Sequence, residues 1–113
     1  MFIEHYSCIA ITKGAVVGDN ITLFQGTTIG KNFGGKNYGY PTIGNNVILF
    51  AGAKIIGNIK VGNNVIVGAN CVVNSNIPDN CVVAGIPGKV ISTNFRDAIT
   101  RAEYELKFGL RGY

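Results

Sequence analysis

Residues 43–67 read IGNNVILFAGAKIIGNIKVGNNVIV, and this segment shows most clearly the pattern from which the fold can be predicted. Every sixth residue in it is aliphatic: Ile43, Leu49, Ile55, Val61 and Val67. An α-helix, with its period of about 3.6 residues, does not produce this spacing, and neither does a simple strand with a period of 2. A short extended segment followed by a sharp corner does produce it.

The same period continues on both sides of this stretch. Ten of the eleven positions in the series are Ile, Val or Leu, and the exception is the single histidine of the chain. The series is His5, Ile11, Val17, Leu23 and Ile29, then Ile43, Leu49, Ile55, Val61, Val67 and Val73. Three extended segments close a triangular coil, and stacked coils pair their backbones at about 4.8 Å. The sequence therefore predicts an all-β fold, a left-handed parallel β-helix of about four coils.

Glycine and asparagine gather at the expected corners of these coils. Examples are Gly18-Asp19-Asn20, Gly44-Asn45-Asn46 and Gly62-Asn63-Asn64. These residue types best tolerate the left-handed backbone that a sharp bend requires. The corners therefore support the coil interpretation independently of the aliphatic series.

The six-residue repeat has one interruption, and it gives way to a different pattern near the end of the chain. Ile29 and Ile43 are 14 residues apart instead of six, so the segment 31–41 carries an insertion and is expected to project as a loop. After residue 91 the apolar period becomes helical, through Phe95, Ile99, Ala102 and Leu106. We expect residues 1–91 to form the β-helix, and residues 92–113 a helix and tail that pack on or cap its open end.

Composition excludes several classes of protein. Charged residues make up 14% of the chain, the net charge is +4, and the lysines are scattered, which is not typical of a nucleic-acid surface. No apolar run approaches the roughly 18 residues of a membrane span. Three cysteines without metal-ligand spacing predict neither a disulfide framework nor a zinc site and suit the cytoplasm. An apolar chain this small and poor in charge is expected to form a homo-oligomer.

Several segments resemble the hexapeptide-repeat acyltransferases, and most of all the β-helical half of serine O-acetyltransferase. They are Glu4-His5 and residues 14–19, 23–30, 41–44, 50–58 and 82–90. The resemblance implies an acetyl-CoA-dependent O-acetyltransferase that works as a homotrimer, with its active site between two subunits and no metal. A small-molecule acceptor would supply the hydroxyl.

The resemblance also implies roles for particular residues. His5 would be the general base, since an imidazole can take a hydroxyl proton near neutral pH. Glu4 would bind the acceptor and not pair with His5, because neighbours on a strand point to opposite faces. Tyr40 would either donate a hydrogen bond to the acceptor or pack the loop. The residues implied in coenzyme A binding are Lys31, Asn32, Ala51, Ala69 and Lys89.

This chain departs from the family in ways that leave alternatives open. An Arg-His-Pro sequence follows the loop in the family, whereas Gly39-Tyr40-Pro41 stands here. We expect no counterpart of the family's helical N-terminal domain. The acceptor could therefore be serine, or a sugar or polysaccharide precursor, and the alternative is a catalytically impaired or partial scaffold protein. The zinc carbonic anhydrases that share this fold need three histidine ligands, and one histidine cannot supply them.

Overall fold

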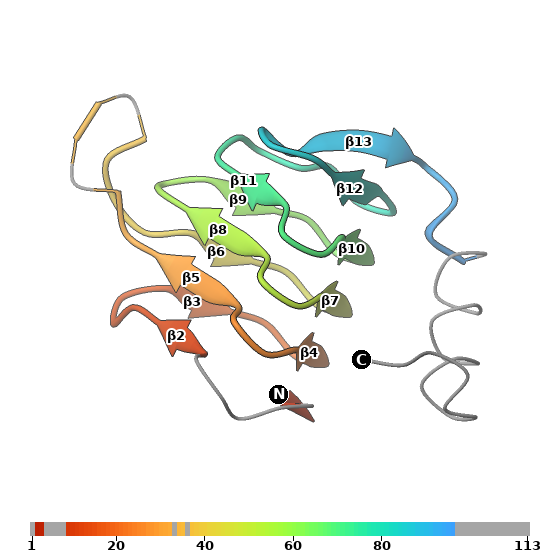
Figure 1. Ribbon diagram of the computed structural model, residues 1–113, viewed down its shortest axis with the longest axis horizontal. Helices are drawn as coiled ribbons and strands as arrows, with labels where there is room; N and C mark the ends of the chain where they lie inside the picture. Colours follow the sequence, from red (N-terminus) through yellow and green to blue (C-terminus); the bar gives the residue numbers. More distant parts are fainter. Residues whose placement is uncertain (1, 4–8, 33, 36, 97–113) are drawn as a thin grey trace.

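The computed structural model of the 113-residue chain describes residues 2–3, 9–32, 34–35 and 37–96. In these residues the chain forms short strands that belong to three sheets (Figure 1). The first sheet contains, in spatial order, β1 (Phe2–Ile3), β4 (Ile21–Leu23), β7 (Val47–Leu49), β10 (Val65–Val67), β12 (Val82–Ala84) and β13 (Lys89–Ser92). The second contains β11 (Val72–Val73), β8 (Lys54–Ile56), β5 (Thr28–Gly30) and β2 (Ala10–Ile11). The third contains β3 (Val16–Val17), β6 (Thr42–Ile43) and β9 (Lys60–Val61).

The chain visits the three sheets in turn and stacks each coil on the one before. Val47 pairs with Val65, and hydrogen-bonded corner residues of these coils are likewise 18 positions apart, which is three hexads. Across the insertion the offset grows to 26, as in the pair of Ile21 and Val47. Within the three sheets, every pair of neighbouring strands is parallel except β12 with β13. The predicted all-β class and parallel stacking are confirmed, whereas the number of coils stays a prediction.

The aliphatic series fills the space between the three sheets. Its members from Leu23 to Val73 are at most 1% exposed, and Val17 packs against them while partly buried. Ile11 is 40% exposed, because β2 is the last strand of the second sheet and has a neighbour only in β5. The series therefore predicts the core correctly except at the end of the stack.

The corners between the third and first sheets are built by asparagine. Four of these corner residues have left-handed φ angles between 58° and 63°: Asn20, Asn46, Asn64 and Asn80. Their side chains also form a ladder that the repeat did not predict, in which the Nδ2 of each donates to the Oδ1 of the next at 2.9–3.1 Å. Glycine is required beside the ladder, since a Cβ on Gly44 would collide with Asn63 Oδ1 and lie 2.9 Å from the Gly62 carbonyl group. Side-chain hydrogen bonds thus join successive coils along this corner.

The outer face of the first sheet carries a second apolar cluster. Phe24 and Phe50 stack with ring centroids 5.0 Å apart, and Ile48 and Ile66 lie buried beside them. Phe95 packs against this cluster, so it contacts the flank of the prism and not its open end. Residues 97–113 lie outside the described residues, so the C-terminal helix and the boundary at residue 91 stay predictions. No helix in the described part is long and apolar enough to cross a membrane.

Candidate functional site

The inserted loop leaves the stack between β5 and β6 and projects from one corner of the prism (Figure 1). Its two ends are joined by a pair of backbone hydrogen bonds between Asn32 and Gly39, each 3.0 Å long. The Asn32 side chain turns into the loop, where its Oδ1 accepts a hydrogen bond from the Gly34 N–H at 3.3 Å. Asn32 therefore has a structural role at the base of the loop. Its predicted contact with coenzyme A stays a prediction.

The loop is anchored to the two coils that follow it. The Asn37 carbonyl oxygen accepts a hydrogen bond from the Asn58 N–H at 2.9 Å. The Asn37 side chain donates to the Asn74 carbonyl oxygen over 2.6 Å. Both partners lie in corners between the second and third sheets, so the loop lies along this column of corners. These contacts give an exposed insertion a defined position on the scaffold.

Lys31 and two tyrosines meet at the loop base. The Lys31 Nζ lies over both rings, 5.1 Å from the centroid of Tyr38 and 5.1 Å from that of Tyr40. Desolvation lowers the pKa of Lys31, but the two neighbouring tyrosines outweigh it and raise that pKa above the ordinary lysine value. The Lys31 ammonium is therefore charged at neutral pH. The sequence placed Lys31 and Tyr40 in one loop but did not predict that Tyr38 would join them.

The other predicted coenzyme A contacts lie away from this cluster. Ala51 and Ala69 occupy successive corners between the first and second sheets, where the Asn70 N–H donates to the Ala51 carbonyl at 2.9 Å. Ala51 is partly buried, whereas Ala69 is exposed. Lys89 is exposed on β13. Strands of the second sheet run from the alanine corner to the loop corner, so one chain does not bring the predicted contacts into a single cluster.

His5 and Glu4 lie outside the described residues, so their roles stay predictions. By chain order they fall in the connection from β1 in the first sheet to β2 in the second. The connections that carry Ala51 and Ala69 also join the first sheet to the second.

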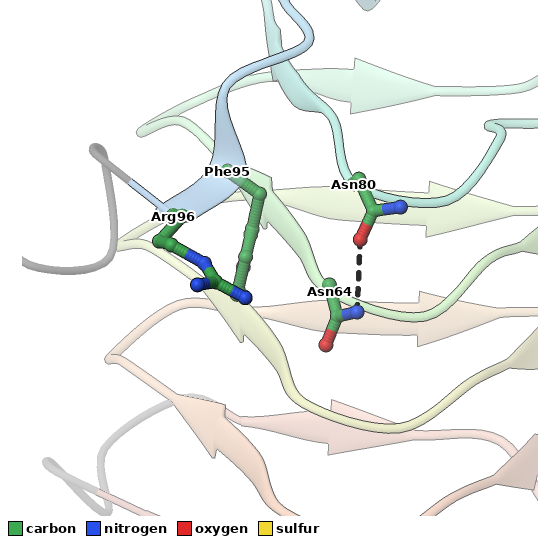
Figure 2. Close-up of a pocket in the computed structure, with 4 residues that line it drawn as sticks. All are labelled: Asn64, Asn80, Phe95 and Arg96. Atoms are coloured by element: carbon green, nitrogen blue, oxygen red, sulfur yellow. Dashed lines mark hydrogen bonds between the residues drawn. The ribbon is translucent and has the colours of Figure 1, made fainter.

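A hollow of about 380 Å³ lies at the third corner and contains none of the predicted site residues. Figure 2 shows Phe95 and Arg96 on one side of it, and Asn64 bonded to Asn80 on the other. That hydrogen bond, 2.9 Å long, belongs to the asparagine ladder. The Gly-Asn-Asn repeats mark this corner in the sequence, but nothing in them indicated a hollow.

Known proteins resemble this chain in both sequence and structure. The family model of bacterial transferase hexapeptide (six repeats) matches residues 40–75. A serine acetyltransferase of Synechococcus elongatus is 46% identical over 93 residues, which cover 80% of this chain and 37% of that protein. A serine acetyltransferase of Staphylococcus epidermidis is 42% identical over 96 residues, covering 85% of this chain and 45% of that protein. The chain thus spans less than half the length of the curated relatives it matches.

Solved structures give the same result. The crystal structure of serine acetyltransferase from Brucella abortus has a TM-score of 0.75 at 36% identity, over 82% of this chain and 38% of that one. The same enzyme in complex with coenzyme A has a TM-score of 0.77 at 35% identity, over 82% and 37% of the two chains. In its repeat, its fold and these relatives, the chain is similar to the hexapeptide-repeat acyltransferases, and among them to the serine acetyltransferases.

Proposed function

We propose that this protein transfers an acetyl group from acetyl-CoA to a hydroxyl of a small acceptor, with serine as the first candidate. One observation carries the proposal: four-fifths of the chain matches serine acetyltransferases, and a structure of one of them contains coenzyme A. A sugar or polysaccharide precursor is the second candidate acceptor, because Gly39-Tyr40 stands where the family has Arg-His. A cytoplasmic location suits the buried free thiols of Cys71 and Cys81.

The proposed chemistry needs one base and no enzyme nucleophile, because a thioester is already activated. His5 takes the proton of the acceptor hydroxyl as its oxygen attacks the thioester carbonyl carbon. The tetrahedral intermediate collapses, the carbon–sulfur bond breaks, and the proton passes from His5 to the sulfur of coenzyme A. Glu4 and Tyr40 bind the acceptor, while Ala51, Ala69 and Lys89 contact the cofactor.

Acetyl-CoA turnover against a panel of acceptors tests this function. We expect release of free coenzyme A with L-serine, or failing that with a nucleotide sugar, and acetyl ester in the product. Glycine, which has the same backbone groups as serine but no hydroxyl, is the matched control and is expected to be inactive. If none of the acceptors raises the release of coenzyme A above the rate measured without protein, the result would favour the catalytically impaired scaffold.

The assembly is part of the proposal. The loop corner and the alanine corner lie at opposite ends of the second-sheet strands, so a neighbour that brings its loop against this alanine corner would complete the site. A three-sided prism achieves this for every copy when three chains pack around a threefold axis.

Light scattering at micromolar concentration measures the assembly directly. We expect three times the 12.0 kDa of one chain. A monomer that still turns over acetyl-CoA would contradict the interfacial site. A monomer without turnover would contradict the predicted trimer.

A further inference from the structure

The inserted loop rests on the corner that Gly57 and Asn58 form. Gly57 has a φ of 96°, which favours glycine, and a Cβ there would lie 2.8 Å from the Asn37 carbonyl oxygen and 3.0 Å from the Asn37 Cβ. On the other side of this contact, a Cβ on Gly39 would lie 3.1 Å from the Asn58 Cβ. The two glycines therefore let the loop and the corner approach each other closely.

Asn37 fastens the loop to two successive corners of the scaffold. Its carbonyl oxygen accepts a hydrogen bond from the Asn58 N–H at 2.9 Å, and its Nδ2 donates to the Asn74 carbonyl oxygen at 2.6 Å. Asn58 and Asn74 belong to consecutive coils, so one residue of the loop spans both of them. The hydrogen bonds between Asn32 and Gly39, in contrast, join the loop to itself. Asn37 thus fixes where the loop lies, whereas that pair fixes its internal shape.

The contact with Asn74 requires a side chain that donates a hydrogen bond. Its partner is a carbonyl oxygen, which only accepts hydrogen bonds, and the Asn37 amide supplies the donor. Aspartate has nearly the same shape as asparagine, but when ionised it supplies only acceptors and would turn a negative charge toward the carbonyl oxygen. Replacing Asn37 with aspartate therefore removes the fastening while it keeps the size of the side chain.

The aromatic side chains of the loop depend on this fastening for their position. Tyr38 follows Asn37 directly and is 56% exposed. Tyr40 packs on Gly14 of the preceding coil, where a Cβ would lie 2.8–3.0 Å from three atoms of the ring. The loop is thus held by Tyr40 on the preceding coil and by Asn37 on the two following coils. When the contacts of Asn37 are lost, the loop can tilt away from the following coils and carry Tyr38 with it.

We propose that Asn37 is a positioning residue, which holds the inserted loop in the orientation that acetyl transfer at the subunit boundary requires. In its catalytic consequence the inference rests on the proposed function, whereas the fastening of the loop does not depend on it. Asn37 acts through the loop and not on a reacting atom. It sets the fraction of molecules whose loop lies against the coils, and substrate binds to that fraction.

Steady-state kinetics test the positioning role. We expect Asn37→Ala to raise the KM of at least one substrate about two- to tenfold, the range for the loss of one neutral hydrogen bond. The value of kcat is expected to stay within twofold of wild type, because saturating substrate returns the loop to its place on the coils. Asn37→Asp is expected to raise the same KM at least as much. Unchanged KM values in both variants of an active enzyme overturn the positioning role.

Asn76→Ala is the matched control for Asn37→Ala. The Asn76 side chain also makes one exposed hydrogen bond to the backbone of a neighbouring coil, in which its Oδ1 accepts from the Lys60 N–H at 2.9 Å. It lies outside the loop, so its loss is expected to lower the thermal stability about as much as Asn37→Ala does and to leave every KM unchanged. An equal rise of KM in the two variants would mean that the effect comes from stability and not from the position of the loop.

Hydrogen exchange at single amides tests the fastening of the loop without any need for turnover. The Asn58 N–H reports on it, because it donates to the Asn37 backbone carbonyl oxygen, which a side-chain substitution does not remove. We expect Asn37→Asp to speed the exchange of the Asn58 N–H about two- to tenfold. The Gly39 N–H, which donates to Asn32 inside the loop, is expected to exchange at the wild-type rate.

The exchange result separates this inference from the proposed function. Faster exchange at Asn58 in a protein that transfers no acetyl group would support the fastening by Asn37 and reject the acetyltransferase. Equal exchange of the Asn58 N–H in wild type and Asn37→Asp overturns the inference whatever the turnover. Faster exchange that the Gly44 N–H shares would also overturn it, because that amide is bonded within the stack and reports a general loss of stability.

Discussion

Replacing His5 with alanine is expected to lower turnover by about two to four orders of magnitude, the usual contribution of a positioned general base. The physical reason is that an acceptor hydroxyl is a weak nucleophile until a base takes its proton. Coenzyme A binding is expected to persist, because the expected contacts Ala51, Ala69 and Lys89 are distant in sequence. The measurements are kcat with saturating acetyl-CoA and, separately, the Kd for coenzyme A.

His5→Asn is the matched variant, since it keeps a polar side chain without a basic nitrogen. It is expected to lose as much turnover as His5→Ala. Wild-type kcat/KM is expected to rise with pH as the imidazole loses its proton, because only the neutral imidazole accepts a proton. If His5→Ala retains more than about a tenth of the turnover, the base assignment is wrong.

Ile29→Ala is expected to lower the free energy of unfolding by about 2–5 kcal/mol, the range for removing a large aliphatic side chain from a packed core. Ile29 is fully buried and has a strand neighbour on each side, through Ile11 and Ile55. The cavity that the shorter side chain leaves cannot collapse, because strands on both sides hold the backbone in place. Urea unfolding at one fixed protein concentration measures the change, since assembly would make stability depend on concentration.

Ile11→Ala is the control for this experiment. Ile11 belongs to the same six-residue series and pairs directly with Ile29, but it is 40% exposed. Ile11→Ala is expected to lower the free energy of unfolding by at most about 1–2 kcal/mol, because the Ile11 side chain buries less apolar surface on folding than that of Ile29. Equal losses for the two variants would mean that the end of the stack is covered as fully as its middle.

The architecture could be predicted because the repeat constrains it at every coil. Few folds bury an aliphatic residue at every sixth position, and a stack of triangular coils is one of them. The glycines and asparagines expected at the corners fit the same fold. The eight extra residues between Ile29 and Ile43 located the loop for the same reason, since they break an otherwise continuous register. The helix after residue 91 rested on a weaker pattern, and Phe95 packs on the flank of the prism and not at its end.

The candidate site could be predicted only in part. His5 attracts attention because it occupies a position that the repeat otherwise gives to aliphatic residues. Lys31 and Tyr40 were selected from the loop by resemblance, and Tyr38 was missed, because no spacing rule says which side chains meet in an irregular segment. Their common contact depends on the chain reversal between Asn32 and Gly39, which is a backbone event.

The stacked strands, the core series and the position of the insertion could be predicted from the amino-acid sequence, because they follow from a hydrophobic pattern that is repeated every six residues. The corner at which each feature lies became known from the three-dimensional fold. It placed the loop cluster and the alanine corners at opposite ends of the second sheet, exposed Ile11 at the end of the stack, and bonded the asparagines into a ladder. Each of these depends on contacts between residues in different coils, and such contacts arise only when the coils have stacked.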